Sequence, residues 1–156
     1  MSRKRTFAAR EIEPDPRYNS VIVSKFINTI MLKGKKSIAE KIVYTALENL
    51  GKKVKKDPLE IFYQALDNVK PLVKVVSRRI GGANYQVPTE VTERNAQAIA
   101  FRWIIQFARK RSEKTMSQRL TSELLAAYNK EGASIRKREE THRMAEANKA
   151  FSHLRF

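Results

Sequence analysis

The chain has 156 residues, of which 32 are lysine or arginine and 16 are aspartate or glutamate, so its formal charge is +16. Because like charges repel one another in a compact state, this excess predicts a polyanionic partner, with nucleic acid first and an anionic membrane surface second. The absence of cysteine excludes disulfides and cysteine-based metal sites, and no apolar run approaches the roughly 18 residues of a membrane-spanning helix.

Residues 1–18 form a basic stretch without the periodicity of a helix or strand. Four of its cations come before Pro14 and Pro16 and have no acidic residue among them. Segments of this kind commonly order on a phosphate backbone. A frayed terminal tail is the alternative. The cations that we assign to nucleic-acid binding are Arg3, Lys4, Arg5 and Arg10.

Three helices are expected after residues 1–18, which we call the basic arm. In the first, from about Asn19, apolar residues recur every four positions from Ile22 to Ile30. The second begins at Ser37, where Glu40 completes a capping box, and ends at Gly51. Its expected apolar stripe is Ile38, Ile42, Ala46 and Leu50.

The third helix begins at Asp57-Pro58, since proline is favoured at the first helical position. Two lysine clusters lie in the turns before the second and third helices. We include Lys35 and Lys36 of the first cluster among the nucleic-acid contacts, because that turn follows the helix next to the basic arm.

A single β-hairpin is expected at about residues 72–91, with turn residues from Gly81 to Asn84. If Ile80 faces Tyr85, then Arg78 lies opposite Val87 and Arg79 opposite Gln86, and the two arginines project from opposite faces. A lone two-stranded ribbon is marginal in water, so we interpret it as a finger that holds its shape against a partner. The alternative is a solvated hairpin whose arginines keep an edge soluble.

A fourth helix is expected from Thr92. On a helical wheel its cations Arg94, Arg102 and Arg109 fall within about 80° of one another, which predicts a phosphate-binding face. An amphipathic helix with a solvated basic face is the alternative. The cations that extend this surface are Lys110, Arg111, Lys114 and Arg119.

A fifth helix is expected from Thr115, with Gln118 completing a capping box, to Gly132. The segment from Ser134 to about Leu154 is helix-prone but polar on nearly every side. We expect such a helix to pack against something outside its own fold, or to fray.

An enzyme is not indicated. No phosphate-cradling glycine motif occurs, and the two histidines are His142 and His153. Glu139, His142 and Glu146 share one helical face, and a solvated charge pattern explains them better than a metal site. We therefore expect a binding protein with no catalytic residues, no cofactor, no metal and no small-molecule substrate.

The chain resembles one family in five stretches: small-subunit ribosomal protein seven, bacterial type. The resemblance is carried, in order and at the family's spacing, by PDPRYNS (14–20), GKKSIAEKIVY (34–44), SRRIGGANYQVP (77–88), FRWIIQFARKR (101–111) and KREETHRMAEANKAF (137–151). At Thr92–Ala96 the chain departs from the family, whose members often place several arginines there.

The resemblance implies a mainly α fold: a single domain of about six helices with a protruding two-stranded β-ribbon arm, in which 1–18 is the N-terminal extension and 19–156 the domain. It implies a primary binder of small-subunit ribosomal RNA that nucleates assembly of the subunit head near the tRNA exit site. The implied location is the cytoplasmic ribosome or a plastid ribosome. The implied partners are ribosomal RNA, neighbouring ribosomal proteins, and exit-site tRNA and messenger.

The resemblance also divides the site residues. The cations named above would bind ribosomal RNA, whereas the hairpin tip and the last helix would approach tRNA and messenger or a neighbouring protein. The residues of this second group are Gly81, Gly82, Ala83, Asn84, Tyr85, Lys137, Arg138 and Arg143. An architectural DNA-binding protein with a β-ribbon arm is the alternative function.

Overall fold

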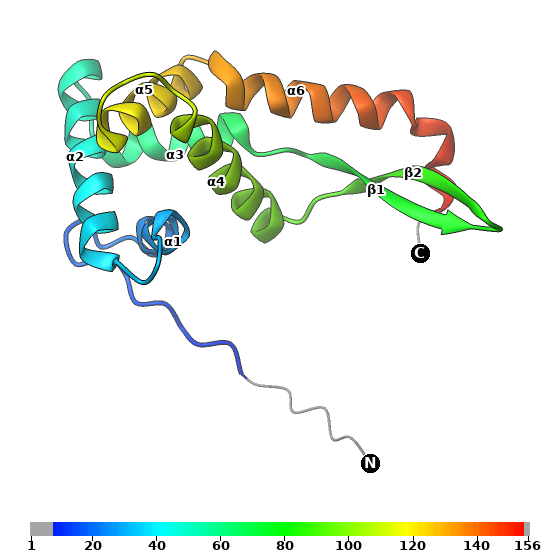
Figure 1. Cartoon of the computed structure of the whole chain (residues 1–156), viewed down its shortest axis with the longest axis horizontal. Coiled ribbons are helices and arrows are strands. Elements are labelled where there is room, and N and C mark those ends of the chain that lie inside the picture. Colours follow the sequence, from blue (N-terminus) through cyan, green and yellow to red (C-terminus); the bar gives the residue numbers. More distant parts are fainter. Residues whose placement is uncertain (1–7, 155–156) are drawn as a thin grey trace.

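A computed structural model describes residues 8–154 and confirms a mainly α fold with one β-hairpin. Six α-helices form the body, and the hairpin projects from it between the third and fourth helices (Figure 1). The elements are α1 (Val21–Ile30), α2 (Lys36–Val54), α3 (Pro58–Val69), β1 (Val73–Ile80), β2 (Ala83–Glu90), α4 (Glu93–Arg109), α5 (Met116–Tyr128), α6 (Gly132–Ala147) and the 3₁₀ helix η1 (Lys149–Leu154).

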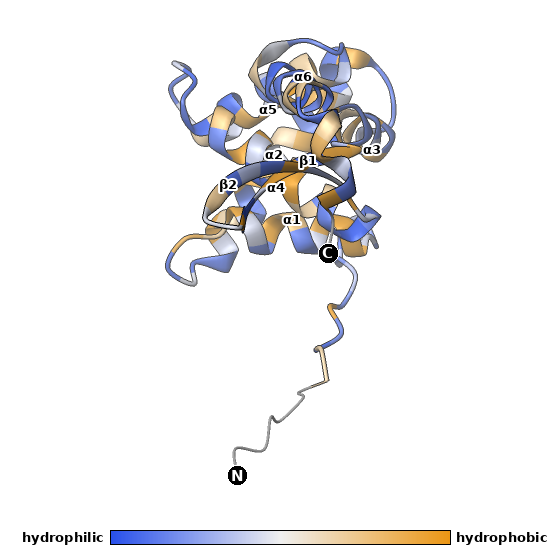
Figure 2. Cartoon of the chain, turned by 90° about the vertical axis from the view of Figure 1, so that its right-hand side faces the viewer, coloured by the Kyte–Doolittle hydropathy of each residue, from blue (hydrophilic) through white to orange (hydrophobic). Residues whose placement is uncertain are grey.

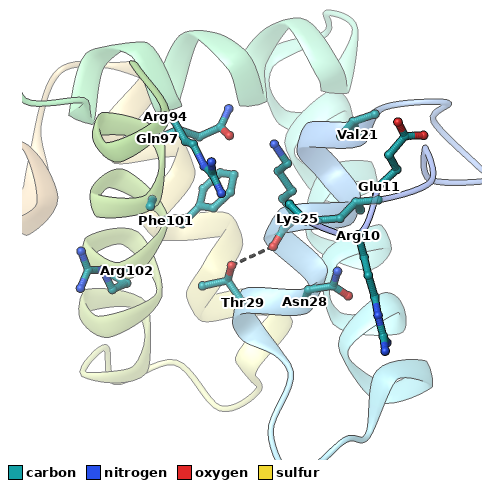
Figure 3. Close-up of a pocket in the computed structure, with 13 residues that line it drawn as sticks. Arg10, Glu11, Val21, Lys25, Asn28, Thr29, Arg94, Gln97, Phe101 and Arg102 are labelled. Carbon is teal, nitrogen blue, oxygen red and sulfur yellow. Dashed lines mark hydrogen bonds between the residues drawn. The ribbon is translucent and has the colours of Figure 1, made fainter. Parts of the chain in front are cut away.

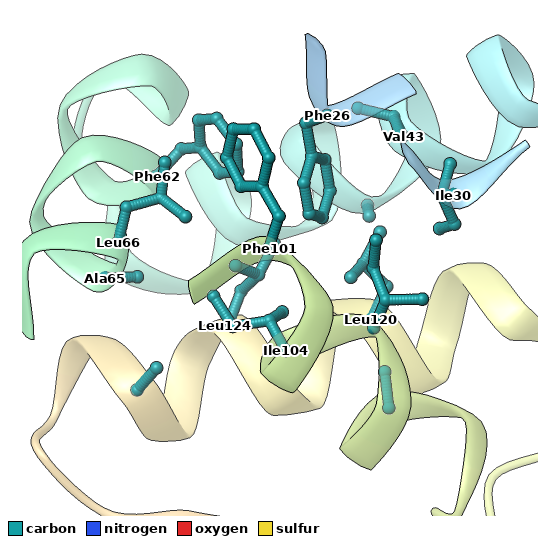
Figure 4. Close-up of a cluster of buried hydrophobic side chains, with 14 of the residues drawn as sticks. Phe26, Ile30, Val43, Phe62, Ala65, Leu66, Phe101, Ile104, Leu120 and Leu124 are labelled. Atoms are coloured by element: carbon teal, nitrogen blue, oxygen red, sulfur yellow. The ribbon is translucent and has the colours of Figure 1, made fainter. Parts of the chain in front are cut away.

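One apolar core joins helices α1 to α5. Phe26 of α1 lies at its centre, with its ring centroid 5.1 Å from that of Phe62 and 5.2 Å from that of Phe101 (Figure 4). Leu120 and Leu124 of α5 close the core from the other side. Hydropathy colouring places the apolar residues toward the middle of the helical body (Figure 2). The core therefore fixes how α1 and α4 lie relative to each other.

Two predicted helix starts are confirmed. The Asp57 carboxylate accepts a hydrogen bond from the backbone N–H of Leu59, with Pro58 as the first residue of α3. Thr115 and Gln118 form the predicted capping box at the start of α5. In both places the residues that cap the helix are neighbours in sequence, so the local pattern is sufficient.

The predicted ends of α2 are wrong. The helix begins at Lys36 without a side-chain cap, and Ile38 is 53% exposed rather than part of the core. Gly51 does not end the helix, which continues to Val54. A Cβ at Gly51 would lie 2.8 Å from the Cγ of Pro58, so the glycine allows close approach of the turn into α3.

The hairpin turn is tighter than predicted. Gly81 and Gly82 have φ of 57° and 85°, and a two-residue turn with both φ positive matches the twist of paired strands. Ile80 therefore faces Ala83, not Tyr85, and Arg78 and Arg79 lie opposite Tyr85 and Asn84. Because the register moves by two residues, the two arginines still point to opposite faces.

The ribbon is not a lone finger, and the last helix is not without a packing face. Helix α6 runs alongside the ribbon and contacts β1 and α5, while η1 packs on β2 (Figure 1). The buried residues of α6 are mostly small or polar: Ser134, Ile135, Thr141 and Ala145. Such a face is hardly visible in hydropathy, which explains why the sequence did not predict it. Gly132, expected to end α5, is instead the first residue of α6.

Within residues 8–154, no helix is both long and apolar enough to cross a membrane.

Candidate nucleic-acid interface

A groove of about 860 Å³ lies between the arm, helix α1 and helix α4 (Figure 3). Residues 9–12 of the arm line one side, the exposed face of α1 lines the middle, and α4 lines the other side. The α1 residues in it are Val21, Lys25, Asn28 and Thr29, and the α4 residues are Arg94, Gln97, Ala98, Phe101 and Arg102.

Core packing turns these faces outward. The buried side of α1 includes Val23, Phe26 and Ile30, so the polar side chains between them in sequence point away from the core. In α4 the burial of Ala100 and Ile104 likewise leaves Arg94 and Arg102 exposed. The predicted clustering of Arg94 and Arg102 on one helical face is confirmed, since both line the groove.

The base of the arm is anchored by Asp15, which is only 2% exposed. Its carboxylate accepts hydrogen bonds from the backbone N–H groups of Arg17 (3.1 Å) and Tyr18 (2.9 Å), and from the Tyr44 hydroxyl of α2 (2.5 Å). Burial, followed by this bond to Asp15, raises the pKa of Tyr44 above its usual value. The contacts fix where the arm leaves the body, beside the groove.

The groove is strongly positive. Four cations line it, against the single carboxylate of Glu11. Within residues 8–154, none of the four cationic groups donates to a carboxylate or carbonyl of the chain. A concave surface lined by unpaired charges of one sign concentrates counterions. The cations are Arg10, Lys25, Arg94 and Arg102.

The positive surface continues beyond the groove. A hollow of about 340 Å³ shares Thr29 and Arg102 with it and adds Arg109 and Lys110. The Nη2 of Arg109 also donates to the carbonyl of Ile30 (3.3 Å), which ties the ends of α4 and α1 together. The predicted Arg102 and Arg109 pair is therefore brought to one surface.

Arg111 and Arg119 differ, because the chain itself occupies their guanidinium groups. Arg111 pairs with Glu113 (3.1 Å) and with Glu123 (3.0 Å), which is 1% exposed. Arg119 donates from Nε to the carbonyl of Glu113 (2.6 Å). Through these contacts the two arginines stabilise the loop between α4 and α5, whether or not they also contact nucleic acid.

Glu123 caps the next helix. Its Oε1 accepts from the backbone N–H (3.3 Å) and the hydroxyl (2.6 Å) of Ser134, in the first turn of α6. A carboxylate is favourable there, because the N-terminal end of a helix is positive and its first N–H groups lack partners. The Arg111–Glu123–Ser134 chain thus links the α4–α5 loop to α6.

The other predicted contacts lie outside the groove. Lys35, Lys36 and Lys114 are exposed in turns or at a helix start, and Arg79 is exposed on the ribbon. Arg78 is half-buried, with an Nε that has no partner within residues 8–154. Arg3, Lys4 and Arg5 lie outside the described residues.

The residues predicted to approach tRNA and messenger divide into an exposed tip and a packed helix. The tip residues Gly81 to Asn84 are exposed, whereas the Tyr85 ring packs against Phe151 of η1, with centroids 5.4 Å apart. On α6, Lys137 pairs with Glu140 (3.0 Å) and Arg138 donates to the carbonyl of Asn68 (2.6 Å). Arg143 is exposed.

His142 has a structural contact. Its Nε2 accepts a hydrogen bond from the backbone N–H of Leu72 (3.0 Å), just before β1. Burial, and then the positive charge of Arg138, lower its pKa from the ordinary value of 6.5. The part of the chain that the structure describes contains no cluster of three potential metal-ligating acids or histidines.

Sequence reasoning missed Lys25, Asn28 and Gln97. Lys25 lies on α1 at the edge of the stripe that contains Ile22 and Phe26, and it is half-buried. Its place beside Arg94 and Arg102 depends on how α1 packs against α4, which no local pattern contains.

Comparison with known proteins finds similar sequences over the whole chain. A family model described as ribosomal protein S7p/S5e matches residues 2–149. Curated relatives named small ribosomal subunit protein uS7 are 58% identical in Nitrosomonas europaea, 59% in Leptothrix cholodnii and 54% in Mycoplasmopsis synoviae. Each of these alignments covers 156 residues and 100% of both chains.

Proposed function

The chain belongs to the ribosomal protein S7p/S5e family, whose members are structural constituents of the ribosome and not enzymes, and from this premise we propose that it anchors and orders RNA in the head of the small subunit. In this role it binds small-subunit ribosomal RNA directly as a primary binder, nucleates assembly of the head and lies near the tRNA exit site. The mechanism is electrostatic anchoring together with recognition of RNA shape, because side chains cannot read the deep major groove of an RNA helix.

One observation carries the proposal: the groove collects Arg10, Lys25, Arg94 and Arg102 with their charges unpaired. The other proposed RNA contacts surround this centre or extend it along the arm, the first turn and the hairpin. They are Arg3, Lys4, Arg5, Lys35, Lys36, Arg78, Arg79, Arg109, Lys110, Arg111, Lys114 and Arg119.

The test is the salt dependence of binding to a head-domain fragment of small-subunit ribosomal RNA. Removing the cation from one phosphate should reduce the slope of log K against log salt by about 0.7–0.9. We expect this reduction for Arg102→Ala. Lys53→Ala is the matched control, because Lys53 is also exposed but lies at the far end of α2. An unchanged slope for Arg102→Ala would exclude this footprint.

Duplex DNA separates the proposal from the architectural DNA-binding alternative. We expect the head-domain RNA to compete far better than a DNA duplex of equal length at the same salt concentration. Equal affinities would favour the alternative, in which the ribbon arm grips a minor groove.

The hairpin tip and the exposed side of α6 are the proposed contacts with exit-site tRNA, messenger and a neighbouring ribosomal protein. The exposure of Gly81 to Asn84 and of Arg143 supports this assignment. Crosslinking from Asn84 in assembled subunits should reach tRNA or messenger. Crosslinks confined to ribosomal RNA would contradict this part of the proposal.

A further inference from the structure

The groove between α1 and α4 contains more than a phosphate-binding surface needs. Apolar side chains line it together with the cations, and two of them, Ile12 and Val21, are 39% and 38% exposed. Large apolar side chains with this much exposure are few among residues 8–154, and these two line the same groove. Phosphate oxygens gain nothing from exposed apolar side chains, so the occupant has an apolar surface as well as negative charge.

Two carboxamides add hydrogen-bonding capacity. Asn28 of α1 and Gln97 of α4 line opposite sides of the groove (Figure 3). Within the described chain, neither side-chain amide is bonded to another group. An amide offers both donors and an acceptor, which suits the edge of a nucleobase better than it suits a phosphate.

The dimensions favour a single nucleotide over a duplex as the group that enters the groove. A volume of about 860 Å³ is in the range of small-molecule pockets, far less than a helical segment of RNA requires. A paired base also hides its hydrogen-bonding edge and its faces from such a groove, whereas unpaired bases in loops and bulges expose both.

We propose that this groove binds an unpaired ribonucleotide of the bound RNA, an inference that rests on the proposed function. Its base lies against Val21, Ala98 and Phe101, within reach of the Asn28 and Gln97 amides. The flanking phosphates lie against Arg94 and Arg102. The groove thereby selects a loop or junction of the RNA, while the remaining cations supply attraction that is independent of sequence.

The absence of cysteine makes a direct test possible, because Ala98→Cys introduces the only thiol of the chain. Ala98 is an exposed residue of α4 in the groove, so the substitution should not disturb the fold. Ala147→Cys, at an exposed helical alanine of α6 outside the groove, is the matched control. Both full-length variants carry a benzophenone maleimide for photocrosslinking to the head-domain RNA fragment.

We expect the label at position 98 to crosslink unpaired nucleotides. Blocking the same thiol with a bulky, uncharged maleimide should lower RNA affinity at least fivefold, which is the scale of a single stacked base. The salt slope should stay unchanged, because no charge is removed. The same label at position 147 should leave affinity unchanged.

Crosslinks confined to paired nucleotides or to protein, the absence of crosslinks, or full affinity after blocking would each overturn the proposal. The proposed function would fail differently: the unlabelled chain would show no salt-dependent preference for the RNA.

Discussion

The arginines of this chain are distinguished by what already contacts their guanidinium groups. Arg94 and Arg102 have no partner among the described residues and line the groove, whereas Arg111 pairs with Glu113 and Glu123. The sequence predicted all three as a shared basic surface, because helical spacing shows direction but not distant partners. Charge alone therefore overestimates the number of cations that have no partner within the described chain.

Arg111 should matter chiefly for stability. Arg111→Ala leaves the carboxylate of Glu123 buried without its cation, and removal of one partner of a buried pair costs about 3 kcal/mol or more. We expect the lower end of this range, because Ser134 still donates two hydrogen bonds to Glu123. Urea unfolding of the isolated chain measures the change in free energy.

Arg102→Ala is the control for this measurement, since its exposed side chain stabilises nothing within the described fold. It should leave the free energy of unfolding within about 0.5 kcal/mol of the unsubstituted chain. If Arg111→Ala proved equally stable while weakening RNA binding, Arg111 would be an RNA contact alone and not also a structural link.

At the scale of elements, local signals were reliable only where both partners are close in sequence. The caps at Asp57 and Thr115 were predicted because each cap bonds an N–H two or three residues away. The role of Gly51 was not, because Pro58 enters its space only once α2 and α3 meet. The packing face of α6 was missed for the same reason: its small side chains become a face only against β1 and α5.

The ribbon tip should depend on the 3₁₀ helix η1. Phe151→Ala removes the ring that packs against Tyr85, and an aromatic pair of this kind is worth about 0.5–1.5 kcal/mol beyond its buried area. We expect faster amide hydrogen exchange in β2 near Tyr85, with little change in α2 to α5. Equal exchange in β2 would show that the Phe151 ring does not hold the tip.

His142 should make the junction between α6 and the ribbon sensitive to pH. The bond from Leu72 requires an unprotonated Nε2, and the pKa of His142 is lowered from 6.5 by burial and by Arg138. The unfolded chain therefore binds more protons than the folded chain between the two pKa values, so stability rises with pH there. The contribution is complete above about pH 6.5 and disappears as the pH falls through the lower value.

This dependence can be isolated by urea unfolding between about pH 5 and about pH 7.5. His142→Gln should flatten the rise in unfolding free energy with pH. His153→Gln, which removes an exposed imidazole bonded only within η1, should keep it. A rise that survives in His142→Gln would assign the proton uptake to other groups.

For the whole molecule, the cations behind the charge of +16 fall into two groups: those paired with carboxylates of the chain and those left unpaired. Some cations are neutralised by carboxylates of the chain, as Lys70 is by Asp67 and Glu93. The groove cations are not, and the packing of α1 against α4 sets the spacing of Lys25, Arg94 and Arg102. The body therefore holds like charges near one another, an arrangement that is unfavourable until a polyanion occupies the groove.

This cost predicts opposite effects of salt on the free and the bound protein. Salt screens the repulsion among the cations of the free chain, so its thermal midpoint should rise with ionic strength. RNA binding stabilises the folded state by mass action. Because that binding weakens steeply with salt, the midpoint of the complex should fall over the same range. Thermal unfolding followed by circular dichroism, with and without the head-domain RNA fragment, measures both trends. If the two midpoints moved in the same direction, the RNA would not be relieving the repulsion that the fold imposes.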